Sequence, residues 1–171
     1  IFHGDLELIS QPTDFLGVNF YLRQTVTASE DSEFFGVEGV DTPGTPVTGM
    51  GWEINPEALT DVLLRVTRDF PVGSIYITEN GSAWNDEVID GNVHDEERID
   101  YLSQHLEAMN IAIDNGAPVK GYFAWSLFDN FEWTQGFSKR FGLFYIDYQS
   151  QERILKASGH WYRRHIKDAG F

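Results

Sequence analysis

Glu79 is the carboxylate whose sequence setting most strongly indicates chemistry. It directly follows the β-prone stretch 75–78, and Asn80-Gly81 ends that strand immediately after it. A charge at the end of a buried strand is costly unless it is paired or used, because burial disfavours the ionised form. We therefore expect Glu79 to point into a site that begins where this strand ends.

Two polar side chains that could serve Glu79 lie in the stretch 15–21, a nearly continuous apolar run typical of a strand buried on both faces. Asn19 and Tyr21 are two residues apart, so they share one face of that strand. Amide and hydroxyl donors beside a carboxylate stabilise its anion, as a nucleophile requires. From this stretch alone, Tyr21 is equally well explained as a core tyrosine with a satisfied hydroxyl.

A third apolar stretch, 121–127, leads into a loop rich in aromatic and polar side chains. Trp125 lies near the end of the stretch, and Glu132 and Trp133 follow in the loop. Indole rings and a hydrogen-bond-accepting carboxylate suit a neutral polyhydroxylated ligand such as a sugar. The plainer interpretation of Glu132 is a surface acid. An acid/base pair with Glu79 is disfavoured, because nothing in the surrounding sequence would raise the pKa of Glu132.

Helical patterns separate these three strands. The segments Asn55-Pro56-Glu57 and Asp95-Glu96-Glu97 are typical helix starts. Apolar residues then recur at helical spacing, namely Leu59, Val62, Leu63, Val66 and Phe70 in the first helix and Ile99, Leu102, Leu106, Met109 and Ile113 in the second. Residues 155–166 predict a last helix with Trp161 and Tyr162 on its apolar side.

The remaining segments are expected to be irregular. Residues 1–13 show no pattern, and residues 80–94 form a polar loop. Residues 27–50 predict a long structureless loop, a kind of segment that often acts as a lid over a site. Trp52 follows this loop, where packing explains an isolated Trp more simply than ligand contact does.

The alternation of strands and helices predicts parallel βαβ units, and therefore an α/β fold. The polar and Trp residues gather after the strands, where barrel-type α/β enzymes carry their sites. Three such units cannot close a barrel of eight strands, and they would leave two open parallel edges. We therefore expect a piece of a larger fold.

Composition excludes several classes of function. The net charge of −15 would repel nucleic acid and anionic membrane surfaces, so neither is an expected partner. There is no Cys, and the five His show no metal-ligand spacing, so no metal site and no cofactor are expected. No Gly-rich phosphate loop follows any strand, which makes a dehydrogenase a distant alternative.

The first residues also bear on the origin of the chain. No secretory signal opens it, and the location is left open, with the cytoplasm favoured. However, Ile1-Phe2-His3-Gly4-Asp5 lacks an initiator Met, so we expect a processed, truncated or excised segment.

Several stretches, taken in order, resemble glycoside hydrolase family 1, the β-glucosidase family. Residues 77–81, Ile-Thr-Glu-Asn-Gly, look like its nucleophile motif, and residues 15–21 resemble its sixth barrel strand. Residues 50–54 resemble the segment that follows. Residues 121–147, with Lys139-Arg140-Phe141-Gly142, resemble its eighth strand and sugar-binding loop.

This resemblance implies a (β/α)8 barrel domain of which residues 1–171 form the C-terminal part, strands six to eight. It implies that Glu79 is the nucleophile of a retaining β-glycosidase and that Tyr21 positions it. Asn19 would belong to the same polar shell. The sugar subsite would be lined by Trp125, Glu132, Trp133 and Phe141, with Trp52 on the aglycone side.

The resemblance also implies what this chain lacks. The family's acid/base Glu lies in an Asn-Glu-Pro motif that does not occur here, and it belongs to the first half of the family's chain. The expected partners are therefore a β-glycoside or oligosaccharide and an N-terminal part of the barrel. Glu132 would repel a 6-phosphate, so a neutral β-glucoside or β-galactoside is expected. The alternative is a non-catalytic fragment that at most binds sugar.

Overall fold

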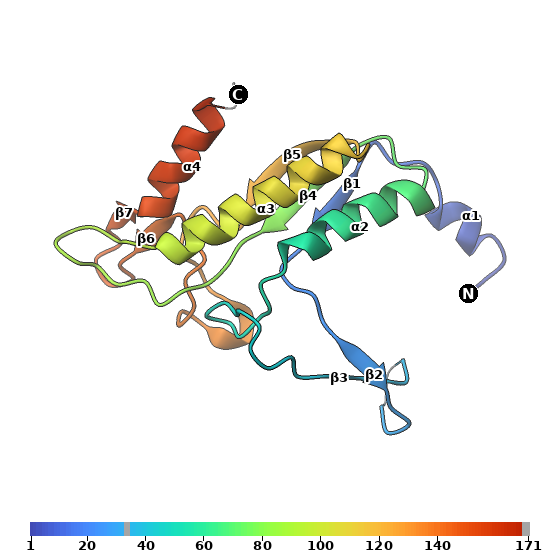
Figure 1. Ribbon diagram of the computed structural model, residues 1–171, viewed down its shortest axis with the longest axis horizontal. Helices are drawn as coiled ribbons and strands as arrows, with labels where there is room; N and C mark the ends of the chain where they lie inside the picture. The colour runs from blue at the N-terminus through green and yellow to red at the C-terminus, as the bar shows by residue number, and fades with distance from the viewer. Residues whose placement is uncertain (33–34, 169–171) are drawn as a thin grey trace.

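In the computed structural model, which describes residues 1–32 and 35–168, four helices and seven strands follow one another along the chain (Figure 1). In order they are α1 (Asp5–Ile9), β1 (Leu16–Asn19), β2 (Val26–Ala28), β3 (Val37–Gly39), α2 (Pro56–Asp69), β4 (Ile75–Asn80), α3 (Glu96–Asp114), β5 (Val119–Ala124), β6 (Phe144–Ile146), β7 (Arg153–Leu155) and α4 (Ala157–Asp168). A single 3₁₀ turn, η1 (Trp133–Gln135), lies between β5 and β6.

The three predicted strands form one parallel sheet in the order β1-β4-β5. Leu16 pairs with Ile75, and Ile75 pairs with Val119, so the strands start level with one another. Their carboxyl ends therefore meet at one edge of the sheet, as the sequence predicted. Among the described residues, β1 and β5 each pair with a strand on one side only.

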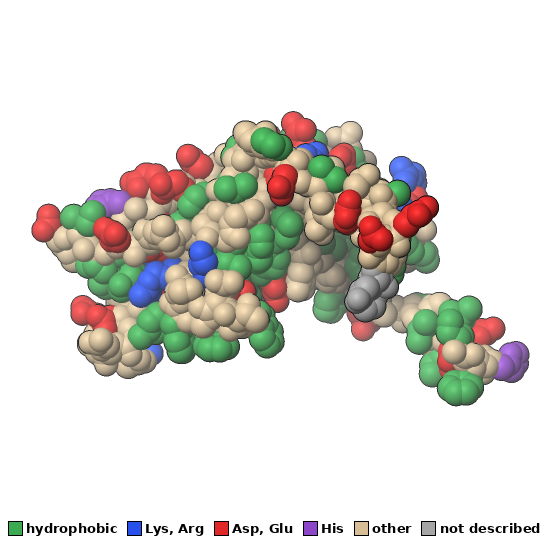
Figure 2. Space-filling model, turned by 90° about the horizontal axis from the view of Figure 1, so that it is seen from below, with side chains coloured by type: hydrophobic (Ala, Val, Ile, Leu, Met, Phe, Trp, Pro, Cys, Tyr) green, Lys and Arg blue, Asp and Glu red, His purple; other side chains and the backbone are tan. Residues whose placement is uncertain are grey.

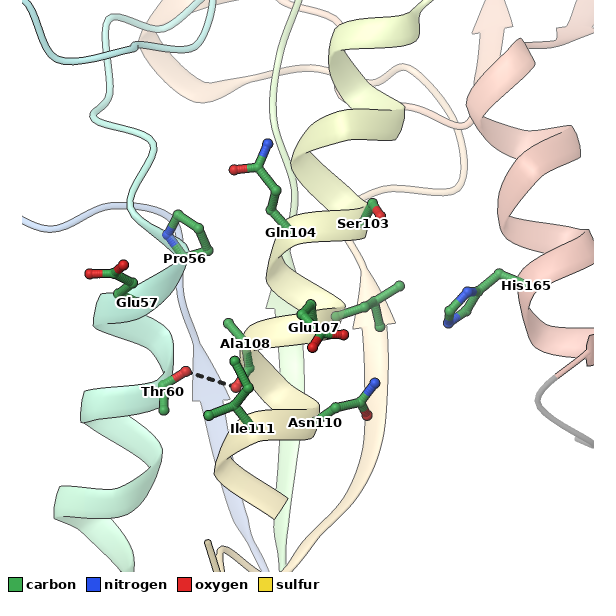
Figure 3. Close-up of a pocket in the computed structure, with 11 residues that line it drawn as sticks. Pro56, Glu57, Thr60, Ser103, Gln104, Glu107, Ala108, Asn110, Ile111 and His165 are labelled. Atoms are coloured by element: carbon green, nitrogen blue, oxygen red, sulfur yellow. Dashed lines mark hydrogen bonds between the residues drawn. The ribbon is translucent and has the colours of Figure 1, made fainter. Parts of the chain in front are cut away.

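Helices α2 and α3 cover one face of this sheet (Figure 1). Asn55 caps α2 as predicted, because its side chain accepts a hydrogen bond from the Ala58 amide at 3.0 Å. Leu59 and Leu63 of α2 pack on Ile75 and Ile77 of β4 in the main core. The two helices are also joined by a hydrogen bond from the Thr60 hydroxyl to the Ala108 carbonyl at 2.8 Å (Figure 3).

A groove of about 490 Å³ runs along the outer side of α3 between α2 and α4 (Figure 3). Glu57, Gln104, Glu107 and His165 are among its lining residues. None of the site residues predicted from the sequence lines this groove. No helix within the described ranges combines the length and apolar character that crossing a membrane requires.

The buried faces of α2 and α3 differ in part from the apolar stripes predicted from the sequence. In α3, Arg98, Tyr101 and His105 are buried, whereas Ile113 is exposed. Burial in α3 thus depends on the sheet and the loops that pack against this helix, and not on hydrophobicity alone. The prediction that Phe70 belongs to the apolar face of α2 is wrong. This residue has an extended backbone, ends the helix and is 60% exposed.

Three segments predicted as irregular or helical differ in the structure. Residues 27–50 are not structureless, because β2 and β3 form an antiparallel hairpin. Residues 1–13 contain α1, which stands apart from the sheet and carries exposed hydrophobic side chains (Figures 1 and 2). The last helix begins at Ala157, two residues later than predicted, because residues 153–155 pair with β6.

His105 is a buried histidine with one unsatisfied ring nitrogen. Its Nδ1 lies 2.7 Å from the Tyr101 carbonyl, its ring stacks on the Tyr101 ring at 3.9 Å, and its Nε2 has no hydrogen-bond partner. Burial lowers the pKa of His105 to about 4, although the Tyr101 carbonyl opposes this shift. The neutral ring is therefore the form that the fold accommodates.

We predict that His105 makes the protein sensitive to acid. An unfolded histidine takes up a proton near pH 6.5, whereas the folded one does so only near pH 4, so the free energy of unfolding falls as the pH drops between these values. His105→Phe keeps a flat ring and cannot titrate. Between pH 7 and pH 4.5, the free energy of unfolding measured with urea should therefore fall by roughly 2–3 kcal/mol more for the unaltered protein than for the variant.

The exposed His94 provides the control for this prediction. His94→Phe should leave the pH dependence of the unaltered protein in place. Equal losses in His105→Phe and in the unaltered protein would show that His105 is not the sensitive group.

Candidate functional site

A cavity of about 550 Å³ lies at the carboxyl ends of β1, β4 and β5. All eight site residues predicted from the sequence line it, together with Asn130 and Phe131, which the sequence did not single out. The predicted eight are Asn19, Tyr21, Trp52, Glu79, Trp125, Glu132, Trp133 and Phe141. The cavity therefore collects side chains from segments more than 100 residues apart in the sequence, because the parallel strands end at the same edge.

Glu79 and Tyr21 are directly hydrogen-bonded in this cavity. The Tyr21 hydroxyl donates to Glu79 Oε2 at 2.7 Å. Burial raises the pKa of Tyr21 well above its usual value, and the hydrogen bond and charge of Glu79 raise it further. Tyr21 therefore stays protonated at neutral pH and remains a hydrogen-bond donor to the Glu79 carboxylate.

An irregularity between β1 and β4 sets the position of this pair. The register shifts between Val18 and Asn19, so that Asn19 lies opposite Glu79. The Phe20 amide then donates to the Glu79 carbonyl at 2.9 Å. The Asn19 side chain accepts from the Thr78 hydroxyl at 2.7 Å. Asn19 therefore lines the cavity, and its hydrogen bond goes to the neighbour of Glu79 rather than to the Glu79 carboxylate.

Asn80 anchors the segments that carry Tyr21 and Glu79, although the sequence indicated it only as the end of a strand. Its buried amide nitrogen donates to the Phe20 carbonyl at 2.7 Å and to the Tyr101 hydroxyl at 3.1 Å. Its amide oxygen accepts from the Tyr122 hydroxyl at 2.5 Å. Asn80 thus links the residue that follows β1 to α3 and β5, and only the contacts of the fold reveal this.

Gly81 is required by close backbone packing at the same place. A Cβ atom on Gly81 would lie 1.8 Å from the Trp125 carbonyl oxygen. Any side chain would therefore push apart the segments that follow β4 and β5. The glycine after Asn80 thus lets the two site-bearing loops approach each other.

Aromatic rings form one wall of the cavity. The Trp52 ring lies 5.5 Å from that of Tyr21 and 6.0 Å from that of Phe141, centroid to centroid. Phe141 is 2% exposed and so is the deeply buried ring of this wall. Trp133, by contrast, is 82% exposed and lies at the rim. Rings at both depths give the cavity faces on which an apolar side of a sugar can stack.

Glu132 is half-buried in the cavity, at the start of η1. Burial raises the pKa of Glu132, and the negative charge of Glu79 raises it further. The prediction that nothing would raise the pKa of Glu132 is therefore wrong. Neither the burial of Glu132 nor its proximity to Glu79 is visible in the local sequence.

The described residues contain no cluster of three or more His, Asp or Glu side chains placed to hold a metal ion. What the cavity offers is a tyrosine-bound carboxylate, a second carboxylate, an amide and several aromatic rings. Such groups can attack or stabilise an electron-poor carbon and can bind hydroxyl groups.

Comparison with known sequences gives a consistent result. The family model described as glycosyl hydrolase family 1 matches residues 1–171. A bifunctional beta-D-glucosidase/beta-D-fucosidase of Bifidobacterium breve is 49% identical over 96% of this chain and 39% of its own length. A 1,4-beta-D-glucan glucohydrolase of Thermotoga neapolitana is 47% identical over 99% of this chain and 38% of its own length.

The fold comparison agrees with the sequence comparison. The family 1 β-glucosidase of Thermotoga maritima superposes with a TM-score of 0.93 at 45% identity, covering 98% of this chain and 37% of that one. The predicted fold class is thereby confirmed: the chain has the fold of the C-terminal portion of a (β/α)8 barrel, and it spans less than two fifths of that relative. Taken with the family model, this match places the chain in glycosyl hydrolase family 1.

Proposed function

We propose that this chain supplies the nucleophile half of the active site of a retaining β-glycosidase. The observation that carries the proposal is the Glu79 carboxylate, held by the Tyr21 hydroxyl at 2.7 Å in a cavity walled by aromatic rings. Glu79 attacks the anomeric carbon while the bond to the leaving group breaks, and a glycosyl-enzyme ester forms. Water then attacks the same carbon and releases the sugar with retained configuration.

A second acid must protonate the leaving group and later activate the water. Glu132 is the other carboxylate that lines the cavity. Its place among Trp125, Trp133 and Asn130 suits acceptance of hydrogen bonds from sugar hydroxyls. We therefore assign the acid/base role to a residue of a complementary N-terminal barrel segment.

The proposed substrate is a neutral β-glucoside or β-galactoside. Solved structures of the Thermotoga maritima β-glucosidase include complexes with deoxynojirimycin and with castanospermine. Both molecules are uncharged or cationic polyols, which is the kind of ligand that a cavity with two carboxylates and several aromatic rings favours. A 6-phosphate near Glu132 would instead meet a negative charge.

The exposed edges of the sheet support the proposed partner. β1 and β5 leave unpaired edges among the described residues, and large apolar side chains are exposed beside them. Phe15 is 51% exposed, Phe123 57% and Leu127 55%. Exposed apolar surface next to free strand edges favours association with further strands. A complementary segment of the barrel would cover both features.

The proposal predicts hydrolysis only in the presence of that segment. The chain should be assayed with a 4-nitrophenyl β-D-glucoside, alone and together with the complementary barrel segment of a family relative or of its own longer protein. We expect no turnover by the chain alone and clear turnover by the complete enzyme. The complete enzyme should also prefer the neutral glucoside to its 6-phosphate.

Two outcomes would contradict this proposal. Turnover by the chain alone would show that the second acid lies within residues 1–171. A complete, folded enzyme without glycosidase activity would favour the second candidate, a non-catalytic fragment that at most binds sugar. Calorimetric titration with deoxynojirimycin would then measure the remaining binding.

A further inference from the structure

A network of buried charges lies behind the cavity. It comprises Asp86, Asp95 and Asp129 together with Arg98, Arg140 and Lys156. The side chains of Lys156 and Asp129 are fully buried, and those of Asp86, Asp95 and Arg98 are at most 2% exposed. Burying ions costs several kcal/mol each unless every charge is paired, so such a network needs all its members.

Lys156 connects two loops that build the site. Its Nζ donates to Asp86 Oδ2 at 2.5 Å and to Asp129 Oδ1 at 2.8 Å. Asp86 lies in the β4 loop (residues 81–95), which follows Glu79, and Asp129 lies in the β5 loop (residues 125–143), which carries Glu132. Lys156 itself comes from the junction between β7 and α4. Its ammonium group is therefore a direct bridge between the two loops.

Arg98 braces the same loops from α3. Its guanidinium donates to both carboxylate oxygens of Asp86, at 2.8 and 3.3 Å, and to the Arg140 carbonyl at 2.8 Å. It also pairs with Asp95. Because Asp86 keeps this forked pair without Lys156, loss of the lysine would remove the bridge while leaving Asp86 paired.

Asp129 transmits the bridge to the cavity wall. Besides Lys156, it accepts from the Gly142 amide at 2.9 Å and from Arg140 Nη1 at 2.6 Å. The Arg140 guanidinium also lies over the Tyr145 ring at 3.8 Å. Asp129 thus fixes the residues on both sides of Phe141, which lines the cavity, and it stands three residues before Glu132.

We propose that Lys156 is a positioning residue that fixes the β5 loop, and with it Glu132 and Phe141, for binding the sugar. This inference rests on the proposed glycosidase function. Lys156 touches neither Glu79 nor Tyr21 in any hydrogen bond, and their mutual bond is anchored separately through Asn80. Loss of the bridge should therefore weaken sugar binding more than it slows the bond-breaking step.

The test replaces the ammonium group in the complete enzyme. Lys156→Met keeps the aliphatic length and removes the charge. Small misplacements of binding groups cost up to about 100-fold, and we expect KM for 4-nitrophenyl β-D-glucoside to rise about tenfold while kcat changes less than threefold. The Kd of the non-hydrolysable isopropyl β-D-thioglucoside should rise by the same factor. Lys167→Met, the same change on the exposed side of α4, should leave all three values unchanged.

A double variant separates positioning from charge balance. Lys156→Met/Asp86→Asn removes one charge of each sign and so protects the fold if the single variant unfolds. We expect its Tm to recover toward that of the unaltered enzyme while KM and Kd stay raised, because the bridge is still absent. Recovery of KM and Kd together with Tm would overturn the proposal, since Lys156 would then only balance charge.

The other outcomes are equally decisive. A Lys156→Met enzyme with KM and Kd within twofold of the unaltered values would also overturn the positioning role, and the glycosidase assignment would stand. Absence of hydrolysis by the unaltered complete enzyme and by Lys167→Met would instead overturn the proposed function and this inference with it.

Discussion

Replacing Glu79 by Gly in the complete enzyme is expected to lower the turnover of a β-glucoside by a factor of roughly 10⁵, the scale of losses seen when a covalent nucleophile is removed. Among the residues of this chain that line the cavity, the only other carboxylate is Glu132, which lies on the β5 loop and not at the end of β4. The measurement is steady-state hydrolysis of a 4-nitrophenyl β-D-glucoside.

Azide gives this prediction a second, qualitative readout. In Glu79→Gly the small anion can enter the space left by the carboxylate and attack the anomeric carbon from the same side. Because only one displacement then occurs, the product should be the α-glycosyl azide, with inverted configuration. Product configuration can be read by NMR.

Two control variants make the result specific. Glu87→Gly, at an exposed position of the β4 loop, should retain the activity of the unaltered enzyme. Glu132→Gly should lose sugar binding and form no glycosyl azide. Undiminished turnover by Glu79→Gly would contradict the assignment of the nucleophile. So would glycosyl azide formed by Glu132→Gly and not by Glu79→Gly.

Replacing Tyr21 by Phe is expected to lower kcat roughly 10- to 100-fold with little change in KM. The variant removes the hydroxyl that donates to Glu79 Oε2 at 2.7 Å, and hydrogen bonds to charged groups contribute about 1.5–3 kcal/mol. The Phe ring keeps the contacts with Trp52 and Phe141, so the wall of the cavity should persist. Steady-state kinetics with the same glucoside measure the effect.

Tyr162→Phe is the matched control for this variant. The Tyr162 hydroxyl donates to the Tyr122 carbonyl at 3.4 Å, and Tyr162 does not line the cavity. Its loss should leave kcat unchanged. A Tyr21→Phe enzyme whose kcat stays within twofold of the unaltered value would show that the hydroxyl does not orient Glu79. A large rise in KM instead would assign Tyr21 to substrate binding.

Several residues of the site could be found from the sequence because their signals are local, whereas Trp52 and Phe141 were expected there only from the family resemblance. Glu79 follows a β-prone stretch and precedes Asn80-Gly81, and both features are encoded within seven residues. The alternation of strand and helix patterns then implies parallel strands whose carboxyl ends meet. From this alone Asn19, Tyr21, Glu79 and Glu132 could be expected at one edge, where the structure places them.

The local sequence could not reveal which polar side chains would be buried. His105 and Arg98 lie on α3 at positions that a hydrophobic pattern assigns to no core, yet both are almost fully buried. Their burial depends on what the sheet and the loops bring against the helix. The hairpin β2–β3 was not expected either, since each of its strands is only three residues long and all six residues are exposed.

The sequence by itself thus determined the chemical groups, the alternation of the three sheet strands with helices α2 and α3, and the strand end at which Glu79 stands. Only the tertiary structure decided how those groups are held. The Lys156–Asp86 bridge spans 70 residues and the Tyr21–Glu79 bond spans 58, and no local pattern specifies such pairs. A buried charge takes its partner from whatever the packing of distant loops places within hydrogen-bond reach, so the positioning of Glu79 and of the β5 loop is a property of the fold.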